Sequence, residues 1–270
     1  MIDLNPILPQ VESWVKEVGA LQLDKLKQKE HRIESKSTVI DLVTEVDKSS
    51  EAILLGKVRT AFPEHSILAE ESGALANTSD YCWVIDPLDG TINFIHGFPV
   101  FAISIALQYR GESVLGVVYL PALGESFTAV KGSGAFLNGR RLRVSDQTSL
   151  EQSLLATGFP YDRATDPDNN LNYFNRLITR VQGIRRTGSA AYDLCNVAAG
   201  RFDGYWELKL KPWDIAAGTL MVVEAGGVVS DVAGFKSNKG RAIIAANPVL
   251  SEVITANLKA AAGPNCQDGL

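Results

Sequence analysis

The hydrophobic positions of the first residues recur at helical spacing. Between residues 7 and 26, apolar side chains follow one another every three or four residues, which predicts a helix. The charged stretch over residues 27–36 predicts a mobile loop, and residues 39–43 predict a short strand. Apolar positions return at helical spacing over residues 48–62 and stop at Pro63, so a second helix is expected there.

Short β-rich runs separated by Gly or Pro follow these helices. The dipeptide Asn138-Gly139 is typical of a type I′ hairpin turn. The first half of the chain is therefore expected to be rich in sheet and mostly antiparallel. The runs cover residues 67–69, 83–85, 101–108, 114–119, 126–130 and 135–137.

After about residue 145 the pattern changes to alternating strands and helices, which predicts an α/β second half. No repeat or long linker appears, so we expect residues 1–145 and 146–270 to be two halves of one compact unit, ending in a frayed tail from residue 263. The last helix should have Asn247 as its N-cap and Pro248 at its first position. The other predicted elements are strands at 153–157, 184–186, 203–208, 228–230 and 242–245, and helices at 169–180, 190–199 and 213–224.

Composition removes several classes of function. The chain has 270 residues, is 46% hydrophobic and carries a formal net charge of −5, with its Lys and Arg scattered, so nucleic acid is not expected to be a main partner. Three widely spaced cysteines indicate neither a disulfide framework nor a zinc cluster. The start of the chain lacks a secretory signal, and the longest apolar run, residues 98–107, is too short to span a bilayer. A cytoplasmic protein without a membrane role is therefore expected.

The segment Asp86-Pro87-Leu88-Asp89-Gly90-Thr91 carries candidate chemistry. Two carboxylates flank a proline at a predicted strand end, so both can point into one space and attract a hard cation such as Mg²⁺, Mn²⁺ or Ca²⁺. The Leu88 carbonyl could add a ligand, and the backbone N–H groups of Gly90 and Thr91 could bind phosphate oxygens. The alternative is an ordinary surface turn, since Asp, Pro and Gly dominate turns.

Other acidic residues have similar double interpretations. Glu70 and Glu71 follow an apolar run, so their side chains should point to opposite faces and only one can reach a site. Asp47 and Asp214 each lie at the start of a predicted helix, where an N-cap is the simpler interpretation.

Taken together, these segments resemble the inositol monophosphatase family. Its two signatures match residues 83–94, from Trp83 to Phe94, and residues 213–218, Trp213-Asp214-Ile215-Ala216-Ala217-Gly218. The likeness extends from residues 41–47 through 69–72 to 224–227, so it covers nearly the whole chain. The resemblance implies a layered αβαβα sandwich, usually a homodimer, and an Mg²⁺-dependent, lithium-sensitive phosphatase.

The resemblance also implies the ligands of two or three Mg²⁺ ions. Glu70, Asp86 and the Leu88 carbonyl would hold one ion, Asp86, Asp89 and Asp214 a second, and Asp47 with Glu70 a weaker third. Mn²⁺ is an alternative ion, whereas Ca²⁺ and Li⁺ are expected to inhibit. A metal-activated water, oriented by Glu70 and the Thr91 hydroxyl, would attack phosphorus in line, without a covalent intermediate.

The organic part of the substrate is expected to meet residues of the second half. Matching positions are the turn Gly188-Ser189-Ala190, at a helix N-terminus, and Glu207, which can accept hydroxyl groups. Asp89 and Asp214 would also contact the substrate. Ser189 could equally be a plain N-cap, and Glu207 an ordinary polar residue of a strand.

Basic residues and histidines are weaker candidates. Arg185 and Arg186 are expected on a solvated strand edge, outside the site. Lys36 matches a family lysine near the active-site loop, so contact with the site is open. The histidines His31, His65 and His96 are not spaced as ligands, so surface or packing roles are expected.

The leading hypothesis is hydrolysis of myo-inositol 1-phosphate to inositol and phosphate. Relatives with this metal site act on fructose 1,6-bisphosphate, histidinol phosphate or 3′-phosphoadenosine 5′-phosphate, and the metal motif does not separate them. A hypothesis of another class is a regulatory binding protein with incidental phosphatase activity.

Overall fold

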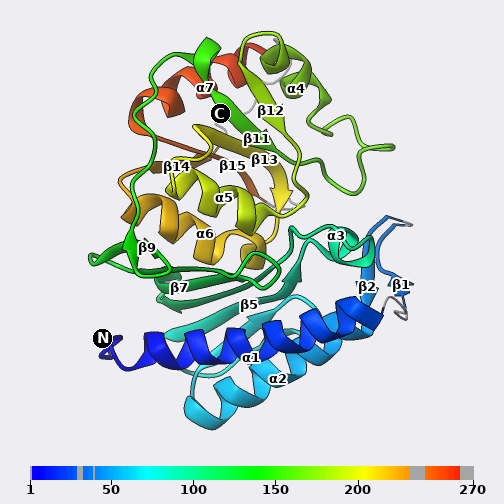
Figure 1. Ribbon diagram of the computed structural model, residues 1–270, viewed down its shortest axis with the longest axis vertical. Helices are drawn as coiled ribbons and strands as arrows, with labels where there is room; N and C mark the ends of the chain where they lie inside the picture. Colours follow the sequence, from blue (N-terminus) through cyan, green and yellow to red (C-terminus); the bar gives the residue numbers. More distant parts are fainter. Residues whose placement is uncertain (1, 29–32, 39, 232–240, 262–270) are drawn as a thin grey trace.

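The computed structural model describes residues 2–28, 33–38, 40–231 and 241–261. Helices and two sheets alternate in five layers, as Figure 1 shows from bottom to top. The αβαβα sandwich implied by the resemblance is therefore present. The outer helices of the first sheet are α1 (Ile7–Gln28) and α2 (Glu45–Ala61), the middle layer is α5 (Ala190–Ala198) and α6 (Pro212–Glu224), and the outer layer of the second sheet is α4 (Leu171–Ile178) and α7 (Pro248–Ala261).

The first sheet has the order β10-β9-β8-β7-β6-β5-β3-β4 in the described residues. Its pairs are antiparallel except β3 with β5, so the expected mostly antiparallel first half is confirmed. Asn138 and Gly139 have φ angles of 47° and 79°, as a type I′ turn requires, and join β9 to β10. The strands are β3 (Ser66–Ala69), β4 (Gly73–Leu75), β5 (Tyr81–Asp89), β6 (Ala102–Tyr109), β7 (Glu112–Leu120), β8 (Glu125–Val130), β9 (Gly134–Leu137) and β10 (Arg140–Arg141).

The second sheet has the order β12-β11-β13-β15-β14. Its first three strands are parallel, and β15 runs antiparallel to both neighbours. The parallel part agrees with the α/β pattern of the second half. The strands are β11 (Leu154–Thr157), which follows the short helix η1 (Leu150–Gln152), then β12 (Gly183–Arg185), β13 (Gly204–Leu210), β14 (Val228–Asp231) and β15 (Arg241–Ala246).

Helix α1 forms because its apolar side chains recur on one face. Val11, Trp14, Val15 and Val18 are buried against the first sheet, where Trp83 of β5 is fully buried beside them. Large apolar side chains of this kind each stabilise the fold by about 1.5–3 kcal/mol when buried. This packing fixes β5, which carries the acidic motif.

Several predicted boundaries change in the structure. The predicted loop over residues 27–36 includes a strand, β1 (Ile33–Ser35), which pairs with β2 (Leu42–Thr44). Val39 and residues 263–270, which the sequence assigned to a strand and a frayed tail, lie outside the described residues. The N-cap of α7 is confirmed, because the Leu250 N–H donates to Asn247 Oδ1 at 2.9 Å. The domain boundary near residue 145 stays a prediction.

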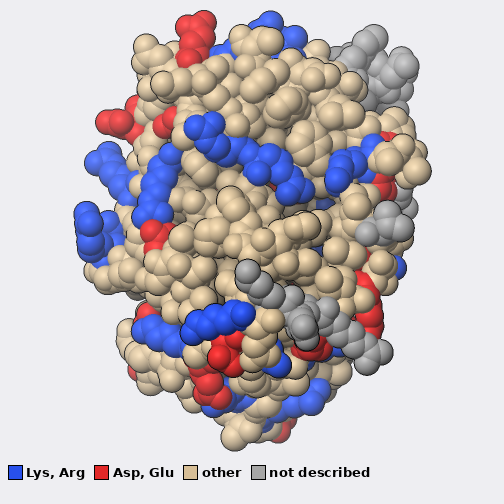
Figure 2. All heavy atoms as spheres, turned by 45° about the vertical axis from the view of Figure 1, so that its right-hand side comes forward, with Lys and Arg blue, Asp and Glu red and all other residues tan. Residues whose placement is uncertain are grey.

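Surface properties bear on the predicted partners. On the face that Figure 2 shows, Lys and Arg side chains gather in a band across the upper half, although they are scattered in the sequence. The absence of a nucleic-acid partner stays a prediction.

None of the described helices is long and apolar enough to cross a membrane. Cys82 and Cys195 are free thiols, and Cys266 lies outside the described residues.

Candidate active site

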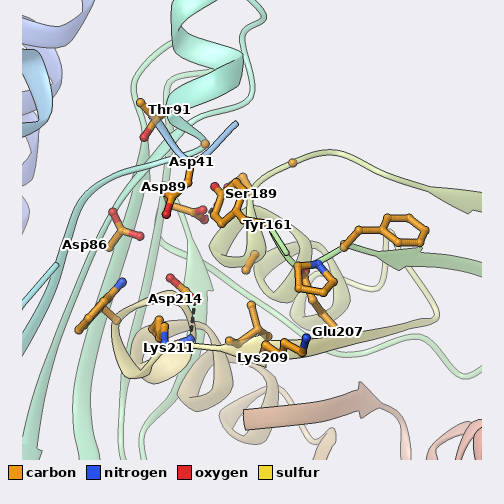
Figure 3. A pocket seen from close by; sticks show the side chains of 18 of the residues that line it. Asp41, Asp86, Asp89, Thr91, Tyr161, Ser189, Glu207, Lys209, Lys211 and Asp214 are labelled. Atoms are coloured by element: carbon orange, nitrogen blue, oxygen red, sulfur yellow. Dashed lines mark hydrogen bonds between the residues drawn. The ribbon is translucent and has the colours of Figure 1, made fainter. Parts of the chain in front are cut away.

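A cavity of about 430 Å³ opens where β5 of the first sheet faces the N-terminal ends of α5 and α6. Asp47 is the one predicted site residue that does not line it. Figure 3 shows Asp86, Asp89 and Asp214 with their carboxylates directed toward a common space. The predicted residues that line the cavity are Glu70, Asp86, Leu88, Asp89, Gly90, Thr91, Gly188, Ser189, Ala190, Glu207 and Asp214.

The acidic motif spans the C-terminal end of β5, which confirms the predicted strand end: Asp86 to Asp89 close the strand, and Gly90 and Thr91 follow it. Asp86 pairs with Ser104 and Asp89 with Ala102, which leaves one extra residue on β5 between them. Pro87, which has no N–H to donate, lies in this bulge, and its carbonyl accepts from Gln22 Nε2 at 2.8 Å. The bulge allows Asp86 and Asp89 to line the same cavity.

Gly90 can approach the neighbouring backbone because it lacks a side chain. Its φ is 94°, and a Cβ there would lie 2.9 Å from the Val100 carbonyl oxygen. The short helix α3 (Thr91–Ile95) begins directly after it. Thr91 Oγ1 lies 2.9 Å from Asp47 Oδ1 and 3.1 Å from the Leu88 carbonyl oxygen.

Asp47 is buried behind Thr91 and is not an N-cap, which corrects the simpler interpretation of this residue. Thr44 is the N-cap of α2, and Asp47, three residues later, completes a capping box by accepting the Thr44 N–H at 2.8 Å. Asp214 has the same place in α6, where it accepts the Lys211 N–H at 2.6 Å. Both helices therefore begin earlier than the sequence predicted.

Asp89 joins the two halves of the chain. Its Oδ2 accepts from Ser189 Oγ and from the Ala191 N–H, each at 2.7 Å. Ser189 is also the N-cap of α5, since its Oγ accepts the Tyr192 N–H at 3.2 Å. The capping interpretation of Ser189 is thus confirmed; Ser189 also lines the cavity, and its contact with a substrate stays a prediction.

Glu70 and Glu71 share one cation, but only Glu70 lines the cavity, which agrees with the expectation that only one of them can reach a site. Lys36 Nζ lies 2.8 Å from Glu70 Oε1 and 2.5 Å from Glu71 Oε1. Burial raises the pKa of Glu71 to about 7, against the opposing effect of Lys36. Lys36 itself lines the cavity, which answers the question that the sequence left open.

The electrostatics of the cavity favour a cation. Burial raises the pKa of Asp86 well above its usual range, and the charges of Glu70, Asp89 and Asp214 raise it further. Burial likewise raises the pKa of Asp214, and it raises the pKa of Asp89 to about 6 against the hydrogen bonds from Ser189 and Ala191. A divalent cation would relieve this repulsion, and donors made only of oxygen suit Mg²⁺.

The carboxylates are not preassembled around one point. Among the residues that the structure describes, no three acidic, His or Cys side chains form a ready-made metal centre. Their oxygens bond instead to Lys36, Ser189 and backbone N–H groups. The donor chemistry thus fits Mg²⁺, while the assignment of each ligand stays a prediction.

Glu207 lines the cavity from β13 of the second sheet. Its Oε2 accepts from Tyr205 Oη at 2.6 Å, and burial raises its pKa to about 7. Glu207 belongs to β13 as the strand interpretation held, and it also lines the cavity. Arg185 and Arg186 are both exposed, as expected. Arg186 also lines the cavity and lowers the pKa of Glu207, so its expected place outside the site was wrong.

Sequence reasoning missed further residues of the cavity wall. Asp41, Tyr161, Lys209 and Lys211 line it and are labelled in Figure 3. Asp41 begins the segment 41–47 that carries part of the resemblance, but it was not assigned to the site. No local motif marks Tyr161, and only the closeness of Glu207 and Asp214 in the sequence pointed to the two lysines. His65 packs between aromatic rings and accepts from Trp83 Nε1 at 3.2 Å, which agrees with a packing role, while His31 lies outside the described residues.

Comparisons with known proteins agree with this geometry. The model of the inositol monophosphatase family matches residues 3–262. The chain is 53% identical over 199 residues to a protein of Pseudomonas aeruginosa named Nus factor SuhB, covering 72% of this chain and 73% of the relative. It is 47% identical over 235 residues to an inositol-1-monophosphatase of Synechocystis, covering 86% and 82%.

The fold matches a solved structure as well. An inositol monophosphatase from Anabaena superposes with a TM-score of 0.86 at 42% identity, covering 96% of this chain and 97% of the other. The family match spans nearly the whole chain and includes the acidic cavity described above. On these grounds the chain belongs to the inositol monophosphatase family.

Proposed function

We propose that this protein is an Mg²⁺-dependent phosphatase whose preferred substrate is myo-inositol 1-phosphate, which it hydrolyses to inositol and phosphate. The observation that carries the proposal is the cavity in which the carboxylates of Asp86, Asp89 and Asp214 repel one another. When bound, Mg²⁺ supplies Lewis acidity that offsets charge on the phosphate and lowers the pKa of a water molecule.

The residues around that space would orient water and phosphate. The Thr91 hydroxyl donates a hydrogen bond to Asp47. A lone pair of Thr91 Oγ1 is therefore left to accept a hydrogen bond from an attacking water. Glu70, whose Oε1 lies 2.8 Å from Lys36 Nζ, would accept a hydrogen bond from the same water. The backbone N–H groups of Gly90 and Thr91 are the donors that we assign to the phosphate oxygens. Asp86, Asp89, Asp214 and the Leu88 carbonyl complete the proposed ligand set.

Glu207 and the Gly188-Ser189-Ala190 turn support a polyol as the alcohol that is released. Deprotonated Glu207 accepts hydroxyl groups, and its raised pKa of about 7 brings this change of charge near neutral pH. Fructose 1,6-bisphosphate, histidinol phosphate and 3′-phosphoadenosine 5′-phosphate are the alternative substrates. A panel of these four esters, assayed with Mg²⁺ for kcat/KM, tests the choice. A higher value for one of the other three would replace inositol 1-phosphate.

A second candidate function is a binding role of the kind that the name Nus factor SuhB indicates for relatives. The substitution Asp89→Asn separates the two functions. It keeps an acceptor for Ser189 and Ala191 but removes the charge, so phosphate release should fall by at least about 100-fold. If the folded variant still performs the cellular role, the binding function is the relevant one.

Asp80→Asn is the matched control for this experiment. Asp80 is an exposed acid paired with Arg110, far from the cavity lining, so its loss should leave activity unchanged. A wild-type chain that releases no phosphate with Mg²⁺ or Mn²⁺ would overturn the phosphatase proposal.

We further propose that the protein is a cytoplasmic homodimer inhibited by Li⁺ and Ca²⁺. Light scattering tests the oligomeric state, and inhibition assays test the effect of the two ions.

A further inference from the structure

The segment from residue 158 to residue 170 connects β11 to α4 and brings Tyr161 to the cavity wall. The Tyr161 ring is 46% exposed, which is high for a large aromatic side chain at a fixed position. Burial raises the pKa of the Tyr161 hydroxyl, and the negative charges of Glu70, Asp41, Asp89 and Asp214 raise it further. Tyr161 lines the same cavity as these four carboxylates.

The two ends of this segment are fixed by one amide. Asn170 is 2% exposed and has a φ of 73°. Its Nδ2 donates to Thr157 Oγ1 at 2.8 Å and to the Gly158 carbonyl at 2.6 Å, while its Oδ1 accepts from Trp206 Nε1 at 2.7 Å. Asn170 therefore ties the end of the segment to its beginning at β11 and to Trp206 of β13.

Its middle is held by an unusual lysine of β13. Lys209 Nζ lies 2.8 and 3.0 Å from the two carboxylate oxygens of Asp162 and 3.1 Å from Asp166 Oδ2. The Lys209 side chain is only 5% exposed, so this ion pair is shielded from water. Asp162 is the residue directly after Tyr161.

The backbone at Lys209 is strained in a way that serves this contact. Its φ is 61°, a region that favours glycine, and it lies where the pairing of β13 with β15 shifts between Glu207 and Leu210. Lys209 follows Glu207 by two residues in the sequence, and both side chains line the cavity. Strain of this kind persists only where other interactions hold it.

We propose that Tyr161 contacts the alcohol part of the phosphate monoester and that Lys209, through Asp162, is the positioning residue that holds it there. The inference rests on the proposed phosphatase function. A protonated phenol adds a donor without adding charge beside the carboxylates, so it can bind a substrate hydroxyl. The wall formed by residues 159–161 thereby selects esters whose alcohol carries hydroxyl groups.

The test compares two esters, inositol 1-phosphate and phenyl phosphate, which has no hydroxyl on its alcohol part. In Tyr161→Phe the KM for inositol 1-phosphate should rise about three- to tenfold, as expected for one lost hydrogen bond, with kcat nearly unchanged. The KM for phenyl phosphate should not change. Lys209→Met should reproduce this selective rise, and Lys209→Arg should restore the wild-type value.

A double variant and a control complete the design. Tyr161→Phe with Lys209→Met should be no worse than the poorer single variant, because both act on one contact. Lys131→Met is the control, since Lys131 pairs with exposed Glu112 outside the cavity, and should leave both KM values unchanged. If Lys209→Met does not fold, Asp162→Asn replaces it.

The outcomes separate this inference from the proposed function. An active wild type with an unchanged KM in Tyr161→Phe overturns the contact alone, and an equal rise for both esters overturns its selectivity. A Lys209 variant that loses kcat for both esters at unchanged KM overturns the positioning role. A wild type that hydrolyses neither ester overturns both the proposed function and this inference.

Discussion

Gly158 leaves the space that the Glu207 carboxylate occupies. A Cβ at position 158 would lie 2.1 Å from both Glu207 oxygens, closer than any side chain tolerates. The glycine is required for this close approach rather than for an unusual φ. The absence of a side chain at position 158, directly after β11, therefore determines where the Glu207 carboxylate lies, which we propose to bind the polyol.

We predict that Gly158→Ala displaces Glu207 and raises the KM for inositol 1-phosphate by about tenfold, the value of one or two lost hydrogen bonds. Steady-state assays measure this. The matched control is Gly56→Ala in α2, where a Cβ meets nothing within 4 Å. That variant should keep its KM and gain about 0.5–1 kcal/mol of stability, because alanine favours helices. A KM for Gly158→Ala equal to that of wild type would contradict the role of Glu207.

At the scale of elements, the capping box of α2 links stability to the site. Thr44 Oγ1 accepts the Val46 N–H at 3.0 Å and lies 2.6 Å from Asp47 Oδ2. Asp47 in turn holds Thr91. The start of one helix thus orients a side chain of the proposed catalytic centre.

We predict that Thr44→Ala lowers the free energy of unfolding by about 1–2 kcal/mol, because a cap is lost and the buried Asp47 loses a partner. Urea denaturation measures this change, and kcat should fall with it as Thr91 loses its fixed orientation. Thr44→Ser retains the hydroxyl and should behave like wild type. An equal loss of stability in both variants would show that the methyl group, rather than the cap, matters.

At the scale of the whole molecule, the buried carboxylates make stability depend on pH and on Mg²⁺. In the metal-free protein the pKa values are about 6 for Asp89 and about 7 for Glu71 and Glu207, above their ordinary values near 4. Between pH 4 and 7 the unfolded chain releases these protons before the folded chain does. Stability from these groups is therefore complete at low pH and is lost as pH rises toward 7.

We predict that metal-free protein melts at a lower temperature at pH 7.5 than at pH 5, and that Mg²⁺ raises the Tm more at pH 7.5. Mg²⁺ binding requires deprotonated carboxylates. At an Mg²⁺ concentration 100 times its Kd, binding adds about 2.7 kcal/mol to the free energy of unfolding. Calorimetry with EDTA or Mg²⁺ at both pH values measures the effect. Asp80→Asn should follow wild type, whereas Asp89→Asn should lose most of the gain. A gain independent of pH would contradict a carboxylate site.

The sequence by itself determined much of this protein. Hydrophobic periodicity located the helices and strands, because it reflects which face each element buries. The acidic residues and their motifs carried the resemblance, and all the predicted cavity residues except Asp47 do line one cavity. These features are local or are read directly from residue types, so no knowledge of packing was needed.

Tertiary structure alone decided the rest. The ion pair of Lys36 with both Glu70 and Glu71 and the place of Arg186 depend on how distant segments pack. The same is true of Lys209 and Asp162, which are 47 residues apart. A contact between distant residues is set by the layers that carry them and by backbone irregularities such as the bulges in β5 and β13, and neither leaves a periodic pattern in the sequence.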